Sequence, residues 1–326
     1  MTLSVVIPVH NDPDGLTRLL TQLGDLQIAD RIFVCDDAST PPCRPAELGF
    51  DEAAAGITYL RSDSHLGAGH ARNMGIAALD TDHVLFFDSD DLLTEDLPGL
   101  LADLDRLEQD GQAFDFCLFR HIDSRQRGQG EPGPMVSDQQ LWQAAGLTDP
   151  APQLISPEQA AQIAMIAAYP WNKIYRTEFL LAQNIRCTEI LVHNDIELHW
   201  ASFIKARRIY ASAVLGCEHF VEPDGQRLTN RKGRERLEVF RALEALHLVL
   251  QDTAQEPRFL LPMTRFYTRL FGWILGTLDP QYQPAFHRKV AGFLLDHHSD
   301  ATMTLIAARD PGLAQQINDN IRRGWA

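Results

Sequence analysis

The chain lacks any long apolar run, and its basic residues are outnumbered by acidic ones. A membrane-spanning helix needs about 18 or more apolar residues, so we expect no transmembrane segment. Lysine and arginine total 29 against 44 aspartate and glutamate residues, and the formal net charge of −15 disfavours nucleic acid and anionic lipid as partners. The chain also begins without the basic residues of a signal peptide, which predicts a cytoplasmic location.

Cysteine is scarce and shows no pattern. The five cysteines are odd in number and include no Cys-x-x-Cys pair, so they fit reduced thiols or small core residues better than disulfides or zinc ligands. Apolar residues, in contrast, make up 45% of the 326 positions. That share suffices for a sizeable core, and the length predicts about two domains.

Four apolar segments alternate with helical patterns in the first part of the chain, and polar residues follow each segment. The segments are residues 3–9, 32–35, 57–60 and 84–87. Strands that alternate with helices predict an α/β fold, with a mostly parallel sheet flanked by helices on both faces. Because the carboxyl ends of parallel strands meet at one edge of a sheet, we expect the polar residues to line a crevice there.

Three carboxylates, Asp88, Asp90 and Asp91, lie within four positions directly after the fourth segment. Hard oxygen ligands at this spacing suit Mg²⁺ or Mn²⁺, which in turn neutralise a diphosphate. A plainer interpretation is a polar turn in which Asp90 or Asp91 caps a helix that starts at Leu92.

The order of four motifs resembles the nucleotide-sugar domain of family 2 glycosyltransferases, which have the GT-A fold. The motifs are residues 4–11, 34–40, 71–75 and 87–91. Farther on, two segments are similar to those that precede and contain the family's catalytic acid, namely residues 171–180 and 193–198. The resemblance covers residues 1 to about 230.

The resemblance implies which residues hold the nucleotide-sugar donor. By this resemblance, the contacts with the base and the ribose of the donor are expected from Pro8, His10, Asp12 and Asp37. Arg72 follows a glycine-rich turn and is expected to meet the diphosphate with its charged fork. Asp88 is expected to contact the ribose or to support the metal. A carboxylate such as Asp37 can accept a hydrogen bond from the imide N–H of uracil, which favours uridine diphosphate sugars.

Metal and catalytic roles are implied in the same way. Asp90 is the expected ligand of Mn²⁺ or Mg²⁺, Asp91 suits either a ligand or a supporting role, and His219 is a further candidate ligand. Asp195 is the expected general base. Two plainer interpretations stay open: His219 as an ordinary packing histidine, and Asp195 as a helix cap.

Trp171 and Lys173 are expected to shape the acceptor side, although Trp171 would also suit the core. The chain departs from the family pattern at three positions, where the usual Tyr, Asn and Glu are replaced by His10, His65 and Asn194. These substitutions bear on which substrate is bound more than on which fold is formed.

We expect a catalytic domain over residues 1–225 and an all-helical appendage over residues 226–326, because helical periodicity replaces the strand pattern there. Residues 124–153 are rich in glycine and proline and predict an extended loop before a helix that is capped by Ser156. In the appendage, core packing, a homodimer interface or a membrane-surface contact would cover the apolar stripe of Phe266, Leu270, Trp273, Ile274 and Leu278.

The sequence therefore predicts a metal-dependent inverting glycosyltransferase that moves a sugar from a nucleotide diphosphate sugar to a hydroxyl acceptor. Synthesis of a bacterial surface glycan is implied by the resemblance alone. A catalytically silent nucleotide-sugar binding protein is the alternative, because Asn194 weakens the catalytic motif. A nucleotidyltransferase is less favoured, because its glycine-rich, lysine-containing loop is absent after the first segment.

Overall fold

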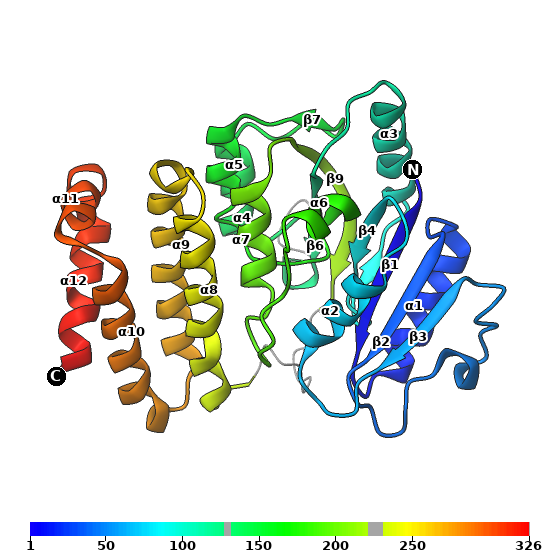
Figure 1. The fold of residues 1–326 in the computed structure, drawn as a ribbon, viewed down its shortest axis with the longest axis horizontal. Coiled ribbons are helices and arrows are strands. Elements are labelled where there is room, and N and C mark those ends of the chain that lie inside the picture. The colour runs from blue at the N-terminus through cyan, green and yellow to red at the C-terminus, as the bar shows by residue number, and fades with distance from the viewer. Residues whose placement is uncertain (127–131, 221–230, 326) are drawn as a thin grey trace. The chain divides into compact units, whose positions relative to one another are not determined.

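The computed structural model describes residues 1–126, 132–220 and 231–325 (Figure 1). The chain divides into two compact units. The first comprises Met1–Ile190 and Asn194–Gly225, and the second comprises Leu191–His193 and Gln226–Ala326. The domain boundary that the sequence predicts near residue 225 lies outside the described residues.

The first unit contains a nine-stranded sheet with the order β3-β2-β1-β4-β8-β6-β9-β5, and β7 pairs with β9. Strands β1, β2, β3, β4, β6 and β9 run in one direction, and β5, β7 and β8 run in the other. The predicted mostly parallel sheet is therefore confirmed. The strands are β1 Leu3–Val9, β2 Arg31–Asp36, β3 Ile57–Arg61, β4 His83–Phe86, β5 Leu92–Leu93, β6 Phe116–Asp123, β7 Gln153–Leu154, β8 Lys173–Arg176 and β9 Ile209–His219.

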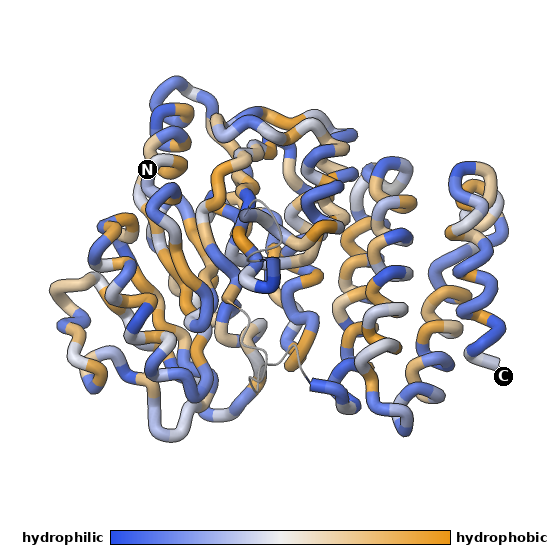
Figure 2. The backbone as a smooth tube through the Cα atoms, turned by 180° about the vertical axis from the view of Figure 1, so that it is seen from behind, coloured by the Kyte–Doolittle hydropathy of each residue, from blue (hydrophilic) through white to orange (hydrophobic). Residues whose placement is uncertain are grey.

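The sheet is buried on both faces, which explains its unbroken apolar strands. Every residue of β1 is buried. Its alternate residues from Leu3 to Val9 join a core with α1 and α3, whereas Val6 faces α2 on the other side. Figure 2 shows the hydrophobic stretches along the central strands. The helices of this unit are α1 Pro13–Leu26, α2 Ala68–Ala78, α3 Leu97–Gln109, α4 Val136–Ala144, α5 Pro157–Ile163, α6 Thr177–Ala182 and α7 Ile196–Lys205, with short 3₁₀ helices at Pro45–Leu48 and Ser124–Gln126.

The extended loop predicted over residues 124–153 is wrong in part, because the described portion contains α4 and begins β7. The glycine and proline residues concealed this helix, whose Trp142 is buried and anchors it to the core. The helix start at Ser156 is confirmed. Its hydroxyl accepts the backbone N–H of Gln159, and the Gln159 side chain accepts the N–H of Ser156.

The second unit is helical, as predicted, with α8 Val239–Gln251, α9 Glu256–Thr277, α10 Gln283–His297, α11 Asp300–Arg309 and α12 Pro311–Trp325, and with short 3₁₀ helices at Arg234–Glu238 and Pro280–Tyr282. Of the apolar stripe on α9, Phe266, Ile274 and Leu278 are buried, whereas Trp273 is 47% exposed. The homodimer interface stays a prediction. None of the described helices combines the length and the apolar composition that a membrane span requires.

The close contact between α2 and the sheet yields a test of the fold. A methyl group on Gly75 would overlap Val6 Cγ1 and would lie 3.3 Å from Cys35 Sγ. Valine is stiff and the strand is buried, so we expect Gly75→Ala to lower the free energy of unfolding by about 1–3 kcal/mol. Urea denaturation measures this change. Gly24→Ala in α1 is the control, since no heavy atom lies within 4 Å of its added methyl group, and equal stability of the two variants would contradict the packing.

Candidate active site

Polar loops from three strands meet at the carboxyl edge of the parallel strands. The register pairs Val9 at the end of β1 with Asp36 at the end of β2, and Val6 with Phe86 at the end of β4. The loops after these strands therefore leave the sheet side by side, as the sequence predicts.

Asp12 joins the loop after β1 to the acidic turn after β4. One carboxylate oxygen accepts the backbone N–H of Gly15 at 3.0 Å and caps α1, and the other accepts the Ser89 hydroxyl at 2.6 Å. Both acceptor oxygens of Asp12 thus hold the site together. Pro8, predicted to contact the base, is buried within β1.

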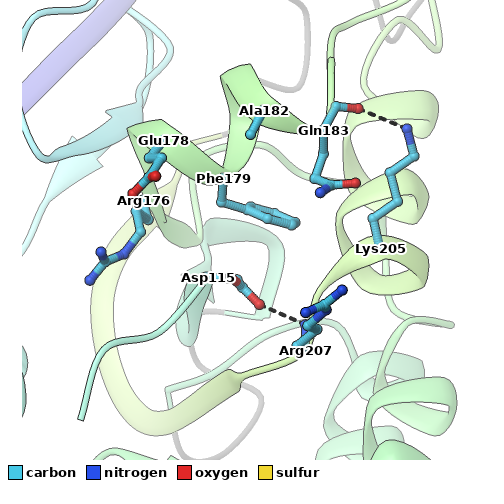
Figure 3. Close-up of a pocket in the computed structure, with 8 residues that line it drawn as sticks. All are labelled: Asp115, Arg176, Glu178, Phe179, Ala182, Gln183, Lys205 and Arg207. Atoms are coloured by element: carbon cyan, nitrogen blue, oxygen red, sulfur yellow. Dashed lines mark hydrogen bonds between the residues drawn. The ribbon is translucent and has the colours of Figure 1, made fainter. Parts of the chain in front are cut away.

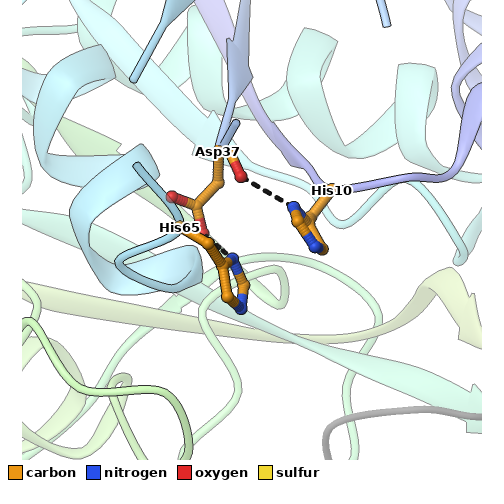
Figure 4. Close-up of side chains that lie close together, drawn as sticks. All are labelled: His10, Asp37 and His65. Atoms are coloured by element: carbon orange, nitrogen blue, oxygen red, sulfur yellow. Dashed lines mark hydrogen bonds and ion pairs between the residues drawn. The ribbon is translucent and has the colours of Figure 1, made fainter. Parts of the chain in front are cut away.

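Asp37 holds the loop that leads into α2 (Figure 4). Its carboxylate is 2% exposed and accepts the N–H groups of Leu66 and Gly67 at 2.8 and 2.6 Å. His65 Nδ1 also lies 2.8 Å from Asp37 Oδ2. His10 Nδ1 lies 2.7 Å from the Asp37 carbonyl oxygen, and its ring stacks on His65 at 4.0 Å between centroids. Two residues that depart from the family pattern therefore stack on each other.

The cluster of His10, Asp37 and His65 offers three ligand atoms within 4.8 Å of one another. The two rings, however, are inclined by only 23°. Stacked rings direct their nitrogen lone pairs side by side and not toward one point, so this geometry suits packing against a flat ring better than metal ligation.

Asp88, Asp90 and Asp91 each offer a carboxylate oxygen within 4.8 Å of the others. The Asp91 carboxyl is 1% exposed, and its Oδ2 has no hydrogen-bond donor among the described residues. Burial of such an acceptor is costly unless a cation or donor reaches it. The cluster caps no helix, since β5 follows it and α3 begins after Asp96. The donor set therefore fits a hard divalent cation.

His219 lies beside this cluster because β5 pairs with β9, with Leu92 opposite Glu218. Asp91 Oδ1 lies 2.9 Å from His219 Nδ1 and accepts the N–H of Phe220 at 3.1 Å. Burial alone would lower the pKa of His219, but the hydrogen bond to Asp91 raises it above its ordinary value. With Nδ1 held by the carboxylate, Nε2 is the atom that could ligate a metal, as in carboxylate–histidine–metal triads.

Trp171 and Lys173, predicted to face the acceptor, are buried with 1% and 0% exposure. Trp171 stacks on Tyr169 at 4.4 Å and on His219 at 5.4 Å. Lys173 Nζ donates to the Tyr169 carbonyl at 2.6 Å and to the Asn172 side chain at 2.7 Å. Burial lowers the pKa of Lys173 to about 7, although Asp195 opposes the shift. Trp171 therefore packs against the candidate ligand His219, and either side chain would have to become exposed before it could contact an acceptor.

Arg72 connects the acidic cluster to the segment that contains Asp195. Its guanidinium is 3% exposed and donates to Asn194 Oδ1 at 2.7 Å and to Asp88 Oδ1 at 2.5 Å. Burial would lower the pKa of Arg72, but the charge of Asp88 raises it, so the group is permanently charged. The predicted contact with a diphosphate stays a prediction, because two protein acceptors occupy this fork here.

Asp195 immediately precedes α7, but its side chain makes no capping hydrogen bond. The capping interpretation is therefore wrong. Burial raises the pKa of Asp195 to about 6, against the opposing charge of Arg72. Glu197 has a different environment, because its Oε2 accepts the Thr188 hydroxyl at 2.5 Å. Residues 193–198 contain two carboxyl groups, Asp195 and Glu197. In the described structure, Asp195 is the one without a capping or side-chain hydrogen bond.

Sequence reasoning missed three supporting residues, and one of them had a signal. Asn194 was noted as a departure from the family pattern, but its role as an acceptor for Arg72 was not predicted. No sequence pattern marked Ser89 or Tyr169, because their partners are distant in the sequence. Ser89 contacts Asp12, 77 residues away, and Tyr169 contacts His219, 50 residues away.

A separate pocket of about 270 Å³ lies at the opposite end of the strands (Figure 3). Two of its charged groups have partners within the protein: Lys205 Nζ donates to the Gln183 carbonyl at 2.8 Å, and Asp115 accepts the backbone N–H of Arg207 at 2.6 Å. Arg176 is likewise paired with Glu108. We therefore assign the active site to the carboxyl edge of the sheet.

Comparison with known families agrees with this geometry. Residues 4–139 match the family model described as "Glycosyl transferase family 2". The matched part of the chain includes the acidic cluster and Arg72 but not Asp195 or His219.

Two curated relatives match parts of the chain. The "Pre-mycofactocin glycosyltransferase" of Mycobacterium tuberculosis is 42% identical over 87 residues, which are 27% of this chain and 17% of the relative. The "Amylovoran biosynthesis glycosyltransferase AmsB" of Erwinia amylovora is 30% identical over 132 residues, which are 39% of this chain and 44% of the relative. The matches thus span less than half of either relative.

Solved structures share the fold along the whole chain. The crystal structure of S. aureus TarS 1-349 in complex with UDP-GlcNAc has a TM-score of 0.75 and 17% sequence identity, and the match covers 99% of this chain and 89% of that one. The complex of the same protein with UDP has a TM-score of 0.72 and 18% identity at the same coverage. At this identity the likeness concerns the fold.

The contact between Arg72 and Asn194 can be tested through stability. Asn194→Ala would leave a buried guanidinium N–H without its acceptor, so we expect the free energy of unfolding to fall by about 1–3 kcal/mol. Chemical denaturation at pH 7.5 measures the change. Arg106→Ala is the control, since Arg106 pairs with Asp103 on the surface with 70% of its side chain exposed, and such pairs contribute about 0–1 kcal/mol. An equally small change for Asn194→Ala would show that this hydrogen bond is dispensable.

Proposed function

We propose that this protein is a metal-dependent inverting glycosyltransferase that uses a nucleotide diphosphate sugar. The observation that carries the proposal is the arrangement around Arg72. Its guanidinium contacts both Asp88 of the acidic cluster and Asn194, the residue next to the uncapped carboxyl group of Asp195. Arg72 thereby links the proposed cation-binding cluster to the residue next to the proposed base.

Uridine diphosphate sugars are the favoured donors. Gly67 N–H and His65 Nδ1 lie against Oδ2 of Asp37, and Leu66 N–H donates to Oδ1. A carboxylate has about four acceptor directions, so one on Oδ1 remains for an imide N–H. The exposed His10 ring supplies a flat surface for stacking of a base. TarS, which shares the fold, was crystallised with UDP and with UDP-GlcNAc, and this supports the same class of donor here.

The residues that would hold a divalent cation are Asp90 and Asp91, with His219 Nε2 as a further ligand and Asp88 in support. When bound, Mn²⁺ or Mg²⁺ would neutralise the charge of the leaving diphosphate. The chain itself orients these ligands: Arg72 holds Asp88, and His219 Nδ1 holds Asp91. The orphaned Oδ2 of Asp91 is the structural observation that supports this assignment.

Asp195 would act as the general base. The acceptor hydroxyl attacks the anomeric carbon from the face opposite the diphosphate, its proton passes to the Asp195 carboxylate, and the carbon–oxygen bond to the diphosphate breaks. A base works best when its pKa is near the working pH, and the pKa of about 6 at Asp195 satisfies this condition. The permanent charge of Arg72 favours the ionised form that accepts the proton.

The acceptor is proposed to be a hydroxyl group of a glycan or a related bacterial surface molecule. The relatives' names, which include amylovoran biosynthesis, support this setting. A catalytically silent donor-binding protein is the second candidate, because Asn194 stands where an acidic residue is usual. Slow hydrolysis of a UDP-sugar in the presence of Mn²⁺ would favour the enzyme, whereas tight binding without any hydrolysis would favour the binder.

The metal assignment predicts that Asp90→Asn abolishes Mn²⁺-dependent binding of UDP while the protein stays folded, because Asp90 lies in a turn and not in the core. Isothermal calorimetry and the melting temperature are measured on the same samples. Asp96→Asn is the control, since this exposed residue precedes α3 without a capping hydrogen bond. Retained metal-dependent affinity in folded Asp90→Asn would refute the assignment.

The catalytic assignment predicts that Asp195→Asn lowers turnover by about 10²- to 10⁴-fold with a nearly unchanged Kd for the donor. In the wild type, kcat/KM should fall as the pH drops below about 6, because Asp195 must be ionised to accept a proton. Glu197→Gln is the control, since that carboxylate is engaged by Thr188. Loss of activity in Glu197→Gln, with Asp195→Asn still active, would reassign the base.

A further inference from the structure

The boundary between the two compact units falls inside the motif that carries the proposed base. Leu191–His193 groups with the helical unit, whereas Asn194 and Asp195 belong to the sheet-containing unit. The backbone of His193 has a φ of 65°, in the left-handed region. Residues with a side chain rarely adopt this conformation, and it persists where the surroundings hold it.

Within the helical unit, two side chains hold His193. The guanidinium of Arg236 places Nη1 3.2 Å from His193 Nε2. Because arginine can only donate, Nε2 must be the acceptor, so the proton of the neutral ring lies on Nδ1. The Trp273 ring meets the His193 ring edge to face, with centroids 5.9 Å apart at 84°.

Arg236 is itself fixed in place. It is 1% exposed, its Nε donates to the Arg231 carbonyl at 2.6 Å, and its guanidinium carbon lies 4.5 Å from the centre of the Trp273 ring. This distance is well within the range of a cation–π interaction. Burial and the charge of Arg236 also lower the pKa of His193 to about 3, which keeps the ring in its accepting form at neutral pH.

We propose that His193, Arg236 and Trp273 form an anchor that positions the segment that begins α7 and carries Asp195. The anchor acts on the backbone, since Asn194 and Asp195 follow His193 directly. Next along the chain, Arg72 donates to Asn194, and the Thr188 N–H donates to the Asn194 carbonyl at 3.1 Å. Two consecutive residues of the motif are thus held by hydrogen bonds, and His193, Arg236 and Trp273 are positioning residues. The catalytic part of this inference rests on the proposed function.

The test compares the full chain with Arg236→Met, which removes the donor and the cation but keeps the aliphatic length. We expect amide hydrogen exchange at residues 194–199 to become faster. We also expect turnover of a UDP-sugar to fall about ten- to a hundredfold, as for a base displaced by a fraction of an ångström to 1 Å, while the Kd for UDP with Mn²⁺ stays within twofold. Arg236→Lys, which keeps a donor and a cation, should restore part of the turnover.

Lys289→Met is the matched control. Lys289 lies over the Phe240 ring at 5.6 Å in the same helical unit, so its loss removes a cation–π contact without touching His193. His193→Gly covers the case in which Arg236→Met does not fold, because glycine accepts the left-handed backbone but cannot bond Arg236. It should reproduce the faster exchange, and the double variant His193→Gly, Arg236→Met should be no worse than either single one.

The outcomes separate this inference from the proposed function. Wild-type exchange and turnover in both Arg236→Met and His193→Gly, or additive effects in the double variant, would overturn the anchor. If the wild type shows no turnover but both variants speed exchange at residues 194–199, the anchor stands and the enzymatic function fails.

Discussion

The buried guanidinium of Arg72 is the interaction on which the site depends. It donates to Asp88 and Asn194 with only 3% of its surface exposed. A permanently charged group in such a place is stable only when its acceptors are kept in position, since removal of one partner strands a buried charge. Arg72 therefore links the acidic turn after β4 to the motif before α7, and its hydrogen bond to Asn194 spans 122 residues of sequence.

The same principle of paired charges extends to the far side of the acidic cluster. Asp91 is buried and would be costly to ionise alone, but His219 and the N–H of Phe220 supply compensation. Trp171 and Tyr169 stack against His219 and restrict its ring. Two of the three neighbouring carboxylates, Asp88 and Asp91, are thus held by partners, and the cluster of three suits a divalent cation.

Much of this was predictable because it follows from local sequence. The strands ending near Val9, Asp36 and Phe86 and the acidic cluster at their shared edge depend on apolar runs and on the geometry of parallel strands. The pairings were not predictable. Asn194 accepts from Arg72 and His65 packs on His10 only because distant loops converge, and helix α4 was hidden by glycine and proline around it.

Asp195 shows why such a site needs a rigid frame. Its pKa is raised by burial, so the folded state holds the proton more tightly than the unfolded chain does. This contribution favours folding at acid pH and is lost as the pH rises through about 6, so above that value the ionised carboxylate opposes folding. An Asp195 carboxylate that is ionised at neutral pH therefore lowers the free energy of unfolding. Because its own burial is unfavourable, neighbouring residues must hold it in place. Arg72 restrains the adjacent residue Asn194 through a hydrogen bond, and its charge favours the ionised form of Asp195, a carboxyl group without a capping bond at the start of α7.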